Sequence, residues 1–346
     1  MNRVAKKRIA WLDIAKLLGM VAIFVGHLSS KSNNALVQWV FAFHVPLFFF
    51  LAGCAETMNK RKIIPNFFHK IKTIIIPLYV FAFITILFTA LSEGGAASIH
   101  AMRNQFFEGF IRNHGFGALW FLSCLFVVEI LFSVIKKTKK WYFIFAISCA
   151  LFCIAYYLIK PWPAISPSWW WNVDSAFLYV PFFAIGYILF PLVKKSYESR
   201  KKIVTAFRNI VGIACLCYLS SIFVGKSIFA RIESINEITA GIMFIVKPLL
   251  CIMAILYVAK LLENVTYLSK IGKCTLYLCG GEYVAKELLI HTSAALFGNK
   301  ITTQFEAPIQ AYIFAIITMA LAFYVLKPIF SYFIEKIQSI KQISKW

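Results

Sequence analysis

Long apolar runs that recur along the whole chain constrain its fold more than any other feature. Ten of them reach the length of about 20 residues that a helix needs to cross the hydrocarbon core of a bilayer. They lie at residues 11–30, 35–55, 71–92, 117–135, 141–159, 174–193, 207–225, 238–260, 271–297 and 309–334. The sequence therefore predicts an all-α, polytopic membrane protein with about ten transmembrane helices.

The composition supports a lipid environment for these runs. The 346 residues are 61% hydrophobic and only 14% charged, whereas a soluble domain of this length would expose far more charge. The first run contains Asp13 and Lys16 and lacks a small-residue cleavage site, so it is expected to stay as a helix and not to be a cleaved signal peptide. We predict one transmembrane domain over residues 1–346, with no appended soluble domain. The connection at 92–116 is the candidate lid, and the Trp- and Pro-rich stretch at 160–173 is a candidate interfacial segment.

The positions of the basic residues predict the orientation. Of the 36 Lys and Arg residues, 26 fall in the termini and connections on one side of the predicted membrane, and 7 fall on the other side. Because cytoplasmic loops carry the excess of Lys and Arg, both ends of the chain are predicted to be cytoplasmic. The protein is thus expected to be a multi-pass protein of the cytoplasmic membrane, in contact with membrane lipid.

A formal net charge of +22 would suit a protein that binds nucleic acid, but the distribution of the charges argues against this function. The basic residues form short clusters between apolar runs, and no phosphate loop, zinc-finger spacing or RNA-binding aromatic motif occurs. Most of the nine cysteines lie inside apolar runs, which is typical of packing residues, and no pair has metal-ligand context. We therefore expect neither a nucleic-acid partner nor a bound metal.

Three ionisable residues lie in the first apolar run. A charged group inside hydrocarbon is costly unless it is paired or faces a polar cavity, so each of the three is a candidate functional residue. Lys16 and His27 are eleven positions apart, within about 20° of the same helix face and about 16 Å apart along the axis. Asp13 can pair with Lys16 at i,i+3. The alternative is an interfacial Asp13–Lys16 ion pair with His27 as a boundary histidine.

A second histidine precedes a proline in the next apolar run. His44 stands two residues before Pro46. A proline inside a helix leaves a carbonyl without its donor and can widen the groove beside the histidine. The alternative is a tolerated kink in which His44 caps a neighbouring group.

These two runs carry a family resemblance. The stretch WLDIAKLLGMVAIFVGH (Trp11–His27), followed by HVPLFFFLAG (His44–Gly53), resembles the membrane acyltransferase-3 family and, within it, the fucose 4-O-acetylase-like sugar acetyltransferases. That family begins with a basic residue, ten further residues and a histidine, a spacing that Lys16 and His27 reproduce. Its next signature is Phe-Phe-x-Leu-Ser-Gly, in which Ala52 here replaces the serine.

Later segments extend the resemblance with more departures. HKIKTIIIPLY (His69–Tyr79) resembles a basic family segment whose arginines are replaced by His69, Lys70 and Lys72. GALWFLSCLF (Gly117–Phe126) and FFAIGYILF (Phe182–Phe190) resemble two further family elements. In the ninth apolar run, Glu282 takes the place where family members often have a histidine.

The resemblance implies an O-acyltransferase that moves an acyl group, most often acetyl, from cytoplasmic acetyl-CoA to a hydroxyl of a surface polysaccharide or a lipid-linked sugar. Transfer to an alcohol needs a base, and histidine is suited to this near neutral pH. We therefore assign His27 as the general base and count Asp13 as the second catalytic residue. Asp13 is expected to orient Lys16 or to hold it charged. Lys16, Lys70 and Lys72 are predicted to bind the CoA phosphates, and His44, Trp120 and Glu282 to bind the acceptor.

Two other functions remain open on the sequence alone. A transporter or flippase of glycan precursors would use Asp13, Lys16 and His27 as a substrate or proton pathway, although the sequence shows no paired halves. A sensing or anchoring module would have kept the fold and lost the chemistry. Glu129, Lys247 and the run Glu282, Lys286, Glu287 and His291 are further ionisable residues within predicted helices, and the last four have the spacing of i,i+4 helix pairs.

Overall fold

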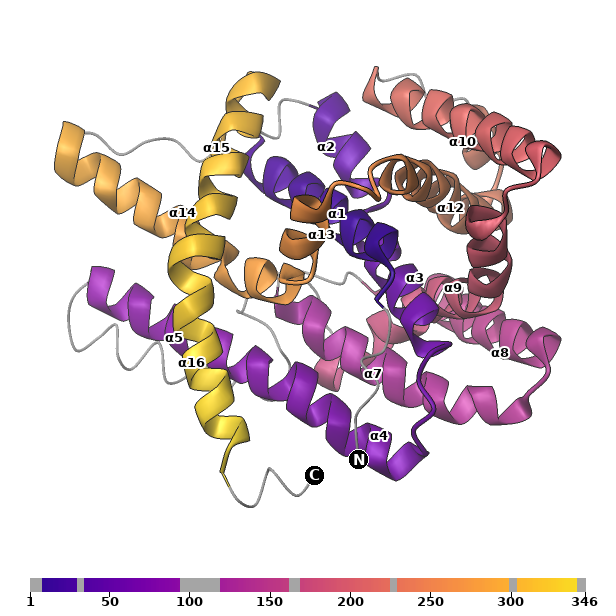
Figure 1. Cartoon of the computed structure of the whole chain (residues 1–346), viewed down its shortest axis with the longest axis horizontal. Coiled ribbons are helices and arrows are strands. Elements are labelled where there is room, and N and C mark those ends of the chain that lie inside the picture. The colour runs from indigo at the N-terminus through magenta and orange to yellow at the C-terminus, as the bar shows by residue number, and fades with distance from the viewer. Residues whose placement is uncertain are drawn as a thin grey trace.

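A computed structural model describes residues 8–29, 34–93, 119–161, 169–224, 229–298 and 304–340. Within these ranges the protein is all-α, and the one backbone bridge outside helices joins Ser29 to Phe305. The helices, shown in Figure 1, are α1 (Ala10–Leu28), α2 (Asn34–Phe41), α3 (His44–Glu56), α4 (Ile63–Lys70), α5 (Ile76–Glu93), α7 (Trp120–Ile135), α8 (Trp141–Cys153), α9 (Val173–Glu198), α10 (Lys202–Phe223), α11 (Ala230–Glu233), α12 (Glu237–Leu261), α13 (Thr266–Gly272), α14 (Thr275–Phe297), α15 (Pro308–Leu321) and α16 (Lys327–Gln338).

Eight helical stretches in the described ranges are long and apolar enough to cross a membrane. They are Ala10–Leu28, Ala35–Glu56, Ile63–Ser92, Trp141–Ile159, Trp170–Glu198, Lys202–Phe223, Glu237–Leu261 and Pro308–Gln338. Each corresponds to one of the ten predicted runs, so the prediction of an all-α polytopic membrane protein is confirmed. The other two runs form α7, which has 16 residues, and α14, which carries Glu282, Lys286 and Glu287. Most of the connections predicted at 92–116 and 160–173 lies outside the described residues.

Apolar side chains on the outside of the bundle mark the surface that faces lipid. On α10, Ile203, Phe207 and Ile210 are 78%, 67% and 67% exposed, and they recur at the i, i+4, i+7 spacing of one helix face. Helix α15 repeats the pattern with other large aliphatic residues. A soluble protein rarely exposes such continuous apolar stripes, whereas lipid tails solvate them.

The second predicted run is two helices and not one kinked helix. Helix α2 ends at Phe41, and α3 begins at His44 after a turn at Ala42–Phe43. Pro46 therefore lies in the first turn of α3, where its missing N–H would have no intrahelical partner. The predicted kink at Pro46 is wrong, and the backbone bend lies just before His44 instead.

Helix α1 is the central helix of the bundle. It contacts α2, α3, α12, α13, α14 and α15. Its buried side chains belong to two apolar clusters, one with α3, α7, α8, α9, α10 and α12 and the other with α5, α14, α15 and α16. Figure 1 shows α15 and α16 as one long rod at the left of the view and α10 at the upper right, with α1 between them. A polar stripe on α1 must therefore face other protein or a cavity and not lipid.

Two glycines allow α3 and α9 to touch backbone to backbone. A Cβ atom on Gly53 would overlap the carbonyl of Phe183 on α9, and one on Gly186 would overlap the carbonyl of Phe50 on α3. Small residues permit this close approach between membrane helices. The two glycines belong to the two aromatic motifs singled out in the sequence, which thus pack against each other.

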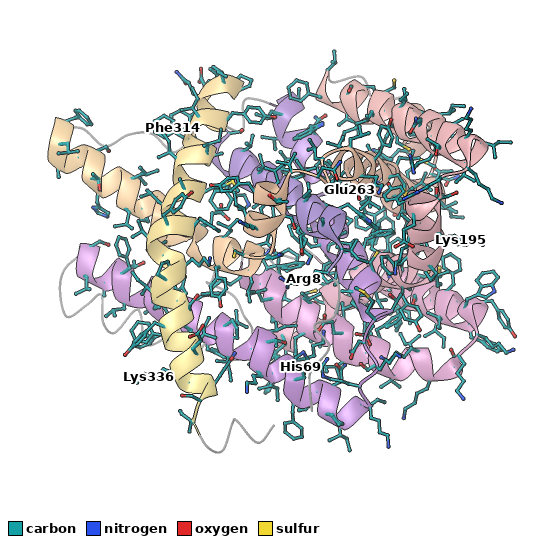
Figure 2. The ribbon with its side chains drawn as sticks, in the orientation of Figure 1. Arg8, His69, Lys195, Glu263, Phe314 and Lys336 are labelled. Carbon is teal, nitrogen blue, oxygen red and sulfur yellow. The ribbon has the colours of Figure 1, made fainter. Side chains whose placement is uncertain are left out.

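Side-chain contacts divide the helix ends into two groups. At one end Lys136 pairs with Glu56, Lys70 with Glu129, and Gln338 donates to the carbonyl of Lys72. At the other end Lys160 pairs with Glu237, and the N–H of Phe305 donates to the carbonyl of Leu28. In Figure 2, His69 and Lys336 are labelled along the lower margin and Phe314 at the upper left. This division agrees with the alternating path predicted from the basic residues.

Candidate active site

A cavity of about 1460 Å³ lies inside the bundle and is lined by residues of α1, α2, α3, α5, α7, α9, α10, α11, α12 and α14. The contribution of α1 is a single stripe, consisting of Lys16, Met20, Ile23 and His27. Their spacing of i, i+4, i+7 and i+11 keeps all four on one helix face. The predicted shared face of Lys16 and His27 is thus a cavity wall, with the two side chains about 16 Å apart along the helix.

The pair Asp13–Lys16 occupies the end of this stripe nearest the N-terminus. Nζ of Lys16 lies 3.1 Å from Oδ1 of Asp13, and the Asp13 side chain is only 5% exposed. Helix α13 packs tightly here, since a Cβ on Gly272 would overlap the backbone of Asp13. The next residue, Lys273, lines the cavity as well. Two lysines therefore lie at this end, one of them held by a buried carboxylate.

His27 is paired with a carboxylate from a helix far away in the sequence. Its Nδ1 lies 2.5 Å from Oε1 of Glu282 on α14, across a sequence separation of 255 residues. The Glu282 side chain is 8% exposed, whereas the His27 side chain is 32% exposed and lines the cavity. A carboxylate on Nδ1 fixes the ring orientation and leaves Nε2 as the nitrogen that can meet a substrate.

His44 lies on the same cavity with its ring fixed. Nδ1 of His44 is 3.0 Å from the carbonyl oxygen of Val40, to which it donates, near the end of α2. The ring also meets Phe41 edge-on, with 4.8 Å between ring centroids. His44 and His27 are close enough to interact electrostatically. The break between α2 and α3 thus supplies the carbonyl that orients His44.

An aromatic wall faces the cavity from α7, α9 and α12. Trp120, Phe121, Tyr179 and Phe244 all line it. The rings of Trp120 and Tyr179 lie 6.2 Å apart, and Phe49 stacks on Tyr179 at 5.0 Å. Trp120 therefore has one side in packing and another on the cavity, which suits contact with an apolar or sugar face. Ala52, the residue that replaces the family serine, also lies on the lining.

Lys70 and Lys72, predicted to join Lys16 at the donor site, are not among the residues that line the cavity. Lys70 forms an ion pair of 2.6 Å with the buried Glu129 of α7. The carbonyl of Lys72 accepts from Gln338 of α16. A π-helical turn at Ile71–Ile75 joins α4 to α5 at this point and interrupts the regular α-helical spacing.

Three further lysines line the cavity besides Lys16. Lys247 of α12 pairs with Glu233 of α11 at 2.5 Å, which supplies the partner that a lysine within a membrane helix needs. Lys286 lies on α14, and Lys273 precedes that helix. Lys247 and Lys286 were recognisable as charges deep within apolar runs, but Lys273 was not, because it lies at the very start of its run and was counted with the basic residues of the connection before it. In the described ranges no group of three or more His, Cys, Asp or Glu side chains is arranged to hold a metal ion.

Fold and site together define a multi-pass membrane protein that holds a histidine–carboxylate pair on an internal cavity. Such a pair is the usual apparatus of acid–base chemistry. The chain belongs to the acyltransferase-3 family, because the family described as an acyltransferase domain matches residues 9–327. No curated protein and no solved structure gave a match. The family makes the protein an acyltransferase, which favours the enzyme over the transporter among the functions considered above.

Proposed function

We propose that the protein is an O-acyltransferase that moves an acetyl or other acyl group from cytoplasmic acyl-CoA to a hydroxyl of a surface polysaccharide or lipid-linked sugar. The cytoplasmic membrane is the proposed location, as the basic-residue pattern predicts. The observation that carries the proposal is the His27–Glu282 pair, 2.5 Å between Nδ1 and Oε1, on the wall of a large internal cavity. The narrower fucose 4-O-acetylase-like assignment has only the sequence resemblance behind it.

His27 is the general base in this proposal. Glu282 accepts a hydrogen bond from Nδ1–H of His27 and keeps the ring in one tautomer. It also stabilises the imidazolium that forms when the ring takes a proton. Nε2 takes the proton of the acceptor hydroxyl as its oxygen attacks the thioester carbonyl. The C–S bond then breaks, and the imidazolium returns the proton to the departing thiolate of CoA. Glu282, predicted as an acceptor-binding residue, is thus assigned to positioning His27.

The donor is proposed to enter at the end of the cavity that holds Lys16 and Lys273. Lysine binds phosphate as a point charge. Asp13 holds Lys16 in place, as the 3.1 Å contact supports. The separation of about 16 Å between Lys16 and His27 along α1 is of the order of an extended pantetheine arm. We therefore transfer the predicted phosphate contacts from Lys70 and Lys72 to Lys273 and keep Lys16.

The acceptor is proposed to occupy the opposite part of the cavity. His44 and Trp120 line the wall there and have their rings fixed by neighbouring groups. A flat aromatic side chain beside a hydrogen-bonding imidazole suits a sugar, which has both an apolar face and hydroxyl groups.

The test is transfer of radiolabelled acetyl from acetyl-CoA in membranes that contain wild type or His27→Ala. We expect His27→Ala to lose a factor of about 10² to 10⁴ in turnover, the usual contribution of a general base, with acetyl-CoA binding unchanged. The matched control is His291→Ala, because His291 lies on α14 in a long 4.0 Å contact with Glu287 and is absent from the cavity lining. Transfer that survives in His27→Ala would remove this residue from catalysis.

A further inference from the structure

Two lysines of the cavity, Lys247 and Lys286, have no role in the proposed reaction, and Lys247 already has a carboxylate partner in Glu233. Lys286 lies on α14, one turn beyond Glu282, which is an advance of about 6 Å along the axis. Helix α14 runs away from the end that holds Lys273, so Lys286 lies on the far side of the His27–Glu282 pair from the donor end. A substrate that contacts Lys286 therefore occupies the acceptor part of the cavity.

Lys286 forms no ion pair with a carboxylate among the described residues, whereas Lys16 and Lys247, the other cavity lysines within helices, pair with Asp13 and Glu233. Its own helix offers Glu282 and Glu287 as neighbours, but Glu282 pairs with His27 and Glu287 with His291. Lys286 also lies close enough to His27 to interact with it electrostatically.

Lys286 has the carboxylates of Glu282 and Glu287 nearby on its own helix but forms a direct ion pair with neither, so its ammonium group can meet a negative group that enters the cavity. A charge at membrane depth needs a counter-charge or water as its direct partner. A negative group of a substrate that binds next to Lys286 supplies that partner.

We propose that Lys286 binds an anionic group of the acceptor, so that the acceptor is a sugar carrying a phosphate or a carboxylate and not a neutral glycan. This inference rests on the proposed function, in which the acceptor is the substrate that receives the acyl group. It adds the chemical class of that acceptor.

Binding without turnover tests the proposal. The protein is purified into nanodiscs of uncharged phosphatidylcholine, and the affinities of two anionic probes are measured without acyl-CoA by tryptophan fluorescence. The probes are a short-chain prenyl diphosphate and methyl glucuronide, each compared with its neutral counterpart, the prenyl alcohol and methyl glucoside. We expect at least one anionic probe to bind ten-fold or more tightly than its neutral counterpart, and the probe that does so identifies phosphate or carboxylate as the source of the charge.

Variants at two lysines locate the site. Lys286→Gln is expected to remove the ten-fold preference, and Lys286→Arg to retain it. The control, Lys194→Gln, alters a lysine that pairs with Glu198 on the surface of α9 and should bind as wild type does. Equal affinity for anionic and neutral probes in the wild-type protein, or an unchanged preference in Lys286→Gln, would overturn the proposal. Because no acyl donor is present, a failure of acyl transfer and a failure of anion binding are separate results.

Discussion

The contact between His27 and Glu282 shows which properties of a site residue can be predicted from the sequence and which cannot. His27 was identifiable as a histidine on the same face as Lys16, and Glu282 as a charge within an apolar run. Their pairing was not predictable, because 255 positions separate them and helix spacing relates only residues of one helix. The sequence allowed two roles for Glu282, acceptor binding or an i,i+4 pair with Lys286, and in the structure Glu282 pairs with His27.

Glu282→Gln tests the role of this carboxylate. The amide keeps the size of the side chain but cannot stabilise the imidazolium, so turnover should fall by a factor of about 10² or more while acyl-CoA affinity stays the same. Steady-state kinetics with separate determination of kcat and KM provide the measurement. Glu287→Gln, one residue from Lys286 on the same helix, is the control and should keep wild-type kcat. A loss of acyl-CoA binding in Glu282→Gln with normal turnover would contradict the assignment.

The lysines at the donor end give a second prediction at the residue scale. Lys16→Ala and Lys273→Ala should each weaken acyl-CoA binding more than they reduce turnover at saturation, since a contact made equally in ground and transition states changes KM and not kcat. Lys70→Ala should leave acyl-CoA affinity unchanged, because Lys70 pairs with Glu129 and does not line the cavity. Isothermal titration calorimetry with CoA measures these affinities. A loss of CoA affinity in Lys70→Ala, with unchanged affinity in Lys16→Ala and Lys273→Ala, would contradict this assignment and support the sequence prediction that Lys70 binds the CoA phosphates.

Helix pairs are held by features that are local in the sequence but act across the bundle. The aromatic motifs around Gly53 and Gly186 were visible as motifs, yet the sequence did not show that each glycine leaves room for the backbone of the other helix. Similarly, the break before His44 was expected as a kink at Pro46. Proline tolerates the first turn of a helix as well as a kink, so the pattern alone did not separate the two.

Gly53→Ala should destabilise the α3–α9 pair. The added Cβ would overlap the carbonyl of Phe183, a backbone atom that cannot move away as a flexible side chain does. We expect a loss of about 3 kcal/mol, the upper part of the range for overpacking, seen as a lower melting temperature in detergent. Gly281→Ala is the control, since its nearest neighbour is a side-chain atom of Phe330 at 3.2 Å. Equal melting temperatures for the two variants would show that the helices can separate at little cost.

A buried polar network joins α3, α4 and α7 at the end where Lys70 lies. Asn66 donates to Ser133 at 3.0 Å, Asn59 donates to Asn66 and to Glu56, and Lys136 and Lys70 pair with Glu56 and Glu129. Removing one partner of a buried ion pair leaves the other charge unpaired. Glu129→Ala should therefore cost about 3–5 kcal/mol, whereas the double variant Glu129→Leu with Lys70→Met should recover much of that loss. Thermal unfolding of the single and double variants measures the difference, and equal losses would refute an unpaired-charge explanation.

At the scale of the whole molecule, the length of the apolar runs predicted eight candidate spans in the described ranges correctly. The runs that form α7 and α14 are less typical of membrane spans. Helix α7 has only 16 residues, and α14 carries three charged residues. Two of those charges, Glu282 and Lys286, line the cavity, so the least membrane-like helix contains the carboxylate of the site. The identity of the helices that neighbour α14, and the cavity that they enclose, depend on contacts between distant segments. Neither could be derived from the periodicity of the sequence.

The central claim is that the α1 stripe from Lys16 to His27 forms the wall along which the acyl donor reaches the base. A cryo-electron microscopy structure with a non-hydrolysable thioether analogue of acetyl-CoA tests it most directly. The account predicts phosphates beside Lys16 and Lys273, the pantetheine arm along Met20 and Ile23, and the acyl carbon about 3–4 Å from the position of an acceptor hydroxyl bound to His27 Nε2. Density for the analogue in another part of the molecule, with the α1 stripe unoccupied, would contradict it.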